Sequence, residues 1–256
     1  MAAQPARTQP IRQAVLAGPR LLARSPLSFI AWVLLRLVEQ YVTLAVLLAA
    51  RLGGAVLGVG AVWAVLLALP FEAVLIAALL RAELKPEAKA FAFLRLGTVE
   101  FNMAGLLVLA GLAGAVIALP ASIAAAYAGF GLRQPLVAGS ALAIGSVAAA
   151  LALMRLTPAA AIVAEGGRVD LAAAWRASRG RYILLAAIVI AAAALERILG
   201  AAVTGPIVPP ELASWAALAS PLRLAGVAWR SLVGVAALAV MTGAIATVWR
   251  TRQTLD

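Results

Sequence analysis

Three arginines and three glutamates fall inside stretches of the sequence that are otherwise apolar, where a charge is costly and is usually paired or functional. They are Arg36, Glu39, Glu72, Glu196, Arg197 and Arg230. Arg36 and Glu39 are three residues apart, which places them on one face of a helix, whereas Glu196 and Arg197 are adjacent and must point apart. We therefore expect Glu196 to pair with Arg230 on the following helix.

The depths of Arg36, Glu39, Glu196 and Arg230 in a bilayer nearly coincide when each helix is taken to rise about 1.5 Å per residue, and Glu72 lies lower. This coincidence predicts a buried, neutral charge network near the midplane that joins the first and last helices. Such a network either holds helices together or forms a path for protons or a polar substrate. The sequence leaves both roles open.

Other chemistry is restricted by the absence of cysteine and histidine. Thiol catalysis, disulfides, imidazole acid–base catalysis and most haem or transition-metal ligation need those residues. The sequence also has no Gly-rich phosphate loop ending in Lys-Ser/Thr, no Gly-x-Ser-x-Gly and no metal-ligand spacing. We therefore expect neither an enzyme nor a bound cofactor or metal.

The composition is that of an integral membrane protein. Hydrophobic residues make up 65% and charged residues 12% of the 256 residues, with a mean hydropathy of +1.04, whereas soluble domains carry about 25% charge. The net charge of +11 then predicts basic loops facing anionic lipid headgroups, not nucleic acid.

Six apolar runs predict an all-α polytopic fold with six transmembrane helices. The runs cover about 26–50, 55–80, 97–127, 134–157, 182–203 and 220–249. Ser25-Pro26 and Ser220-Pro221 have the form of a helix cap followed by proline in the first turn. We expect a single membrane domain over 11–250, built from hairpins 11–80, 86–157 and 169–250, between a disordered cytosolic tail 1–10 and a cytosolic tail 251–256.

Each hairpin is preceded by a short, basic amphipathic segment, beginning near residues 11, 88 and 170. The first has apolar residues at helical spacing among arginines, and we expect it to lie on the membrane surface, broken or kinked at Pro19. In the third, Asp170 is placed to cap a helix whose apolar face carries Leu171, Ala174 and Trp175.

The positive-inside rule orients the chain, because Lys and Arg in cytoplasmic loops set the topology. Fifteen of them fall before the first span, in the loops that follow the even-numbered spans and at the C-terminus, against three in the other loops. Both termini are therefore predicted to be cytoplasmic.

Three arginines near the fifth span, Arg176, Arg179 and Arg181, are candidates for binding a lipid headgroup, because guanidinium groups match phosphate oxygens. The alternative is that they act only as positive-inside topology signals.

The stretch from 158 to 182 also carries a resemblance, over about 30 residues. A Pro at a helix end, an acidic residue with glycines, an Ala/Trp segment and a Gly-Arg-aromatic start to the next helix are Pro158, Glu165, Gly166, Gly167, Ala174, Trp175, Ser178, Arg179, Gly180, Arg181 and Tyr182. It resembles the family that includes the membrane domain of glycerophosphoryl diester phosphodiesterase and YciC-like bacterial membrane proteins. The resemblance implies a bacterial inner-membrane protein, and we expect no phosphodiesterase activity because the chain ends soon after its last hydrophobic run.

These observations favour a non-enzymatic membrane scaffold or lipid-associated protein, whose partners are membrane lipids, chiefly anionic headgroups on the cytosolic side. The alternative is a transporter or channel for a small polar or lipid-like substrate that uses the midplane charges. A membrane-embedded enzyme is the weakest of the three, because no pair of catalytic side chains has a recognisable spacing.

Overall fold

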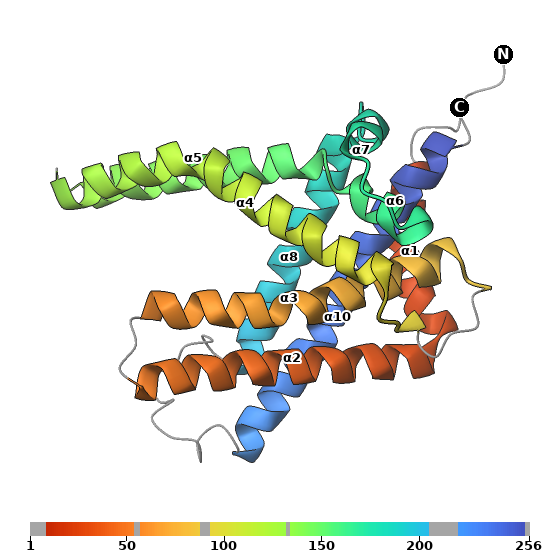
Figure 1. The fold of residues 1–256 in the computed structure, drawn as a ribbon, viewed down its shortest axis with the longest axis horizontal. Helices are drawn as coiled ribbons and strands as arrows, with labels where there is room; N and C mark the ends of the chain where they lie inside the picture. The colour runs from red at the N-terminus through yellow and green to blue at the C-terminus, as the bar shows by residue number, and fades with distance from the viewer. Residues whose placement is uncertain (1–8, 54–56, 88–92, 132–133, 205–219, 254–256) are drawn as a thin grey trace.

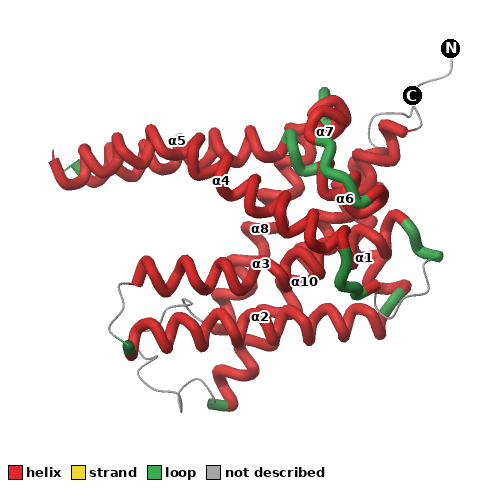
Figure 2. Tube along the Cα trace, in the orientation of Figure 1, coloured by secondary structure: helices red, strands yellow, loops and turns green. Residues whose placement is uncertain are grey.

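A computed structural model of the chain describes residues 9–53, 57–87, 93–131, 134–204 and 220–253. Within these residues the structure is helical and has no strand (Figure 2). Six of the described helices are long and apolar enough to cross a membrane. The expected all-α polytopic fold is therefore confirmed.

The long helices follow the apolar runs closely. They are α2 (Pro26–Leu52), α3 (Leu57–Leu84), α4 (Thr98–Ala126), α5 (Pro135–Met154), α8 (Tyr182–Thr204) and α10 (Pro221–Gln253). Proline stands in the first turn of α2, where its missing N–H is not needed. The hydroxyl of Ser220 accepts a hydrogen bond from Arg223 N at the start of α10, so the Ser-Pro signal there acts as a cap.

Consecutive long helices pack in pairs, α2 with α3, α4 with α5 and α8 with α10 (Figure 1). The C-terminal helix α10 lies at the centre, because it also contacts α1, α2, α3 and α6. Its residues Val235, Ala239 and Ala244 have no exposed surface. The α4–α5 pair instead extends beyond the rest of the molecule, and α4 is the least buried of the spanning helices. The exposed apolar side chains of α4 suit contact with lipid.

The first amphipathic segment forms α1 (Gln9–Arg24), which continues through Pro19. It does not stand apart on a surface as expected, because Ala14 and Leu21 are buried in the core against α10, α2 and α3. Backbone meets backbone at this contact: a Cβ on Gly18 would lie 2.5 Å from Ala239 C and Val240 N. Because Gly18 has only a hydrogen atom as its side chain, the apolar face of α1 can pack directly against α10.

The segment between α5 and α8 also differs from the expectation of a single surface helix. It begins with α6 (Pro158–Gly166), whose residues Ala159, Ala161 and Val163 are fully buried. Gly167 then ends α6 in the left-handed conformation, with φ 69°, which glycine adopts without steric cost. The predicted surface helix is the shorter α7 (Leu171–Ala177), and the Asp170 side chain caps it as predicted by accepting from Ala173 N at 2.8 Å.

The remaining short elements are at the ends of the second pair. The π-helical turn η2 (Tyr127–Gly131) prolongs α4. Most of the second amphipathic segment, residues 88–92, lies outside the described residues, and the part that follows, 94–97, is not α-helical. The tails 1–8 and 254–256 are likewise outside the description, and α10 continues to Gln253, into the stretch expected to be a tail.

Candidate functional site

Arg36 is the centre of the charged cluster that the sequence placed within the membrane. Its Nη1 donates a hydrogen bond to Glu39 Oε2, 2.5 Å away and one turn along α2. The same nitrogen donates to Glu72 Oε1 of the neighbouring α3. One guanidinium therefore links the two helices of the first pair.

A third carboxylate reaches Arg36 from the last pair of helices. Oε1 of Glu196, on α8, lies 4.0 Å from Arg36 Nη2. Gly234 on α10 leaves room for this approach, because a Cβ there would lie 3.1 Å from Glu196 Oε1 and 3.4 Å from Arg36 Nε. The first and last helix pairs thus meet at one arginine, as the sequence led us to expect. The ion pairs described here join that one arginine to three carboxylates, so they do not form the neutral network that was predicted.

The partner of Glu196 differs from the expected one. The sequence argument paired it with Arg230 of α10, but the ion pair that the structure gives Glu196 is with Arg36. Arg230, a residue of α10, lies beside Gly200 of α8, one turn beyond Glu196. Its Cγ is 3.6 Å from the position that a Cβ on Gly200 would take. Arg197 is exposed on the other side of α8, so adjacent residues point apart as predicted.

The cluster is graded in its burial. The side chains of Arg36 and Glu39 are 13% and 8% exposed, whereas those of Glu72 and Glu196 are 26% and 30% exposed. Removing one partner of a buried ion pair strongly destabilises a protein, because the other charge is left buried and unpaired. Direct contact among these groups suits a structural link between α2, α3 and α8. No three acidic, histidine or cysteine side chains within the described residues are grouped to hold a metal ion.

A second set of charges lies at the end of the bundle where α1, α6, α7 and the last turns of α10 meet, which we call the terminal end (Figure 1). Arg176 and Arg179 are exposed there, and Arg181 is partly exposed. These three candidate headgroup arginines therefore share one surface region. The backbone turn at Gly180, with φ 77°, separates Arg179 from Arg181.

Sequence reasoning missed Arg155, which stands between two aromatic rings beside those arginines. Its Cζ is 4.7 Å from the ring centroid of Trp175 and 4.4 Å from that of Tyr182. Both distances are within the range of cation–π attraction. The aromatic residues near a span end were the available signal, since Trp and Tyr favour the membrane interface.

One salt bridge and one group of hydrogen bonds that the sequence did not single out connect the helices at the terminal end. Arg81 of α3 forms a salt bridge with Glu100, which is buried in the first turn of α4. Glu165, one of the residues of the family resemblance, accepts hydrogen bonds at Oε2 from Trp249 Nε1 at 2.7 Å and Gln253 Nε2 at 3.0 Å. Its main-chain oxygen accepts from Lys85 Nζ. Glu165 thus ties α6 to α10 and to the end of α3.

No protein-family model, curated protein or solved structure matches the chain. The function must therefore be argued from the geometry of these charged groups.

Proposed function

We propose that the chain is a non-enzymatic, lipid-associated scaffold of the bacterial inner membrane, related to the YciC-like family. Both termini face the cytoplasm in this proposal, so the terminal end meets the inner leaflet. The concentration of Lys and Arg in the loops of that end supports the orientation.

The observation that carries the proposal is the arginine and aromatic surface around α7. Arg155 stacks between Trp175 and Tyr182, while Arg176 and Arg179 present exposed guanidinium groups beside them. Tryptophan and tyrosine favour the headgroup level, and arginine forms two parallel hydrogen bonds with a phosphate. Together these groups suit an anionic headgroup at the surface of the leaflet.

The intramembrane cluster supports a structural role over a transport path. Arg36 Nη1 is in direct contact with both Glu39 and Glu72, so these groups bind one another and link α2 to α3. A scaffold whose helices are held by such a link needs no moving part at the midplane. A flux assay on the reconstituted protein should accordingly show no transport of protons or small polar solutes.

The test replaces Arg176, Arg179 and Arg181 together by glutamine and measures copurified lipids by mass spectrometry after extraction without detergent exchange. A basic residue near an anionic surface contributes about 1 kcal/mol, so we expect anionic lipids to fall severalfold relative to neutral lipids. The matched control is the triple lysine variant, which keeps the charge and should keep most of the lipid. Unchanged lipid in the glutamine variant would reduce these arginines to topology signals and sink the proposal.

Orientation is checked on the same variants with reporter fusions. Fusions after Asp256 and in the 81–89 loop should report the cytoplasm, and fusions in the 205–220 loop should report the opposite side. This control shows that any loss of lipid does not come from an inverted protein.

A further inference from the structure

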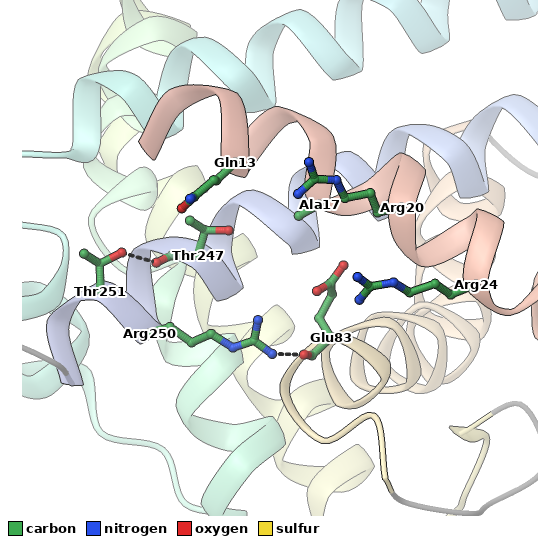
Figure 3. Close-up of a pocket in the computed structure, with 8 residues that line it drawn as sticks. All are labelled: Gln13, Ala17, Arg20, Arg24, Glu83, Thr247, Arg250 and Thr251. Carbon is green, nitrogen blue, oxygen red and sulfur yellow. Dashed lines mark hydrogen bonds between the residues drawn. The ribbon is translucent and has the colours of Figure 1, made fainter. Parts of the chain in front are cut away.

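A pocket lies at the terminal end between α1, the last turn of α3 and the last turns of α10 (Figure 3). It has a volume of about 430 Å³ and is lined by Arg20, Arg24 and Arg250. None of these arginines belongs to the surface around α7. The pocket is therefore a separate concentration of positive charge.

The walls of the pocket are fixed by the close packing of α1 on α10. Gly18 meets the α10 backbone, and a Cβ on Gly243 of α10 would lie 2.8 Å from Gly18 N. Arg20 and Arg24 follow Gly18 on α1 and are one helical turn apart. The close contact between Gly18 and Gly243 therefore sets the backbone positions of Arg20 and Arg24 relative to Arg250.

The third arginine is also held in place. Arg250 Nη2 donates a hydrogen bond to the main-chain oxygen of Glu83, next to the last residue of α3. Carbonyl groups in the last turn of a helix lack partners within the helix and carry partial negative charge. Arg250 thereby caps α3 while its guanidinium remains at the edge of the pocket (Figure 3).

Glu83 supplies the acidic side chain in the pocket. Its carboxylate interacts electrostatically with Arg250 and Arg24 and points into the space between them (Figure 3). Three guanidinium groups and one carboxylate give the lining a net charge of +2. A phosphate monoester carries about −1.5 to −2 at neutral pH, whereas a phosphodiester carries a single charge.

We infer that this pocket binds a phosphate monoester, and that the carboxylate of Glu83 weakens the binding of that anion. Arginine forks match phosphate oxygens in two-point hydrogen bonds, and the side-chain amide of Gln13 on the pocket wall is a further donor. The inference rests on the proposed lipid-associated function, because the pocket lies at helix ends that the proposal places at headgroup level. The same phosphate chemistry occurs in a lipid headgroup and in a soluble phosphate ester.

The experiment measures dissociation constants for the full chain in a neutral detergent. The probes are short-chain phosphatidic acid, short-chain phosphatidylglycerol and glycerol phosphate, so that charge and acyl chains are varied separately. The variants are Arg24→Gln and Glu83→Gln. Arg168→Gln is the matched control, because it removes one exposed charge from the residues before α7 without lining the pocket.

We expect wild-type protein to bind phosphatidic acid more tightly than phosphatidylglycerol. Loss of one charge-assisted contact should weaken phosphatidic acid binding about tenfold in Arg24→Gln, and Arg168→Gln should leave it unchanged. Glu83→Gln should bind more tightly than wild type, because it removes the internal anion and raises the net charge of the pocket. A gain of this kind does not arise from misfolding.

Glycerol phosphate distinguishes the two sources of the phosphate group. Binding as tight as that of phosphatidic acid identifies a soluble ester, and much weaker binding identifies a lipid headgroup. Equal binding of the two lipids, or the same affinities in Arg24→Gln and Glu83→Gln as in wild type, would overturn the inference. If anionic lipids still depended on Arg176, Arg179 and Arg181 in that case, the proposed function would stand without the pocket.

Discussion

Replacing Gly18 by alanine tests whether α1 is docked on α10 or rests on the membrane surface. The added Cβ would lie 2.5 Å from Ala239 C and Val240 N and 2.6 Å from Ala239 O, whereas non-bonded carbons are most stable about 3.5–4.0 Å apart. The two backbones must therefore separate by about 1 Å. Overpacking of this kind costs about 1–3 kcal/mol, against a gain of about 0.5–1 kcal/mol for alanine in a helix.

We accordingly expect Gly18→Ala to lower the free energy of unfolding by about 1–2 kcal/mol. The measurement is a denaturant titration in mild detergent followed by far-UV circular dichroism, with hydrogen exchange of the α1 amides as a local readout. Gly111→Ala on α4 is the matched control, because a Cβ there has nothing within 4 Å and should stabilise by about 0.5–1 kcal/mol. The two substitutions thus have opposite signs.

Gly243 lies across the same contact, since a Cβ there would be 2.8 Å from both Ala17 Cβ and Gly18 N. Once one alanine has separated the helices, the second meets less resistance, so Gly18→Ala with Gly243→Ala should cost less than the sum of the single changes. If Gly18→Ala instead stabilised the protein as Gly111→Ala does, α1 would not be packed on α10 and the pocket between them would not exist.

Two further predictions concern the charged groups. Arg36→Gln should destabilise the protein by about 2–3 kcal/mol, which is below the usual cost of breaking a buried ion pair because Glu72 and Glu196 are partly exposed. Adding Glu72→Gln should restore part of the lost stability. Additive effects of the two changes in the same unfolding titration would show that the two groups do not interact. Arg155→Gln should remove about 0.5–1 kcal/mol of cation–π attraction and should speed hydrogen exchange of the α7 amides. Arg168→Gln is the control and should leave that exchange unchanged. Equal exchange rates in the two variants would exclude a role for the cation–π contacts of Arg155 in holding α7 in place.

The spanning helices could be predicted from the sequence because a bilayer demands long apolar runs, and the runs here are separated by polar or glycine-containing turns. The cap signals at Asp170 and Ser220 were correct for the same local reason, whereas the side chain of Ser25 makes no cap hydrogen bond. Asp170 accepts from Ala173 N, three residues away, so its role needed no knowledge of distant residues.

Docking of α1 was not predictable from periodicity. The apolar face of an amphipathic helix looks the same in sequence whether lipid or another helix covers it. The decisive fact is that Gly18 faces the α10 backbone at Ala239, more than two hundred residues away in the chain. The buried helix α6 was missed because Pro158, taken as a helix end, is the first residue of a new helix.

In the charged cluster, too, the local features were predictable from the sequence and one long-range contact was not. The members of the cluster were predictable, because charges in apolar runs are conspicuous, and so was the pairing of Arg36 with Glu39, three residues apart on one helix. The partner of Glu196 was not, because chain proximity favoured Arg230 and the approach to Arg36 depends on the space that Gly234 leaves.

The distribution of the cluster along the chain has a consequence for biosynthesis. Arg36, Glu39 and Glu72 all belong to the first pair of helices, so Arg36 can offset one of the two negative charges while that pair enters the bilayer, before the rest of the chain is made. Inserting a lone charge at the centre of a helix costs about 2.5–3.5 kcal/mol. Glu196 arrives later on α8 and finds a ready cation in Arg36. The cation that Glu196 approaches is therefore already in the bilayer, within the first pair of helices, when α8 is made.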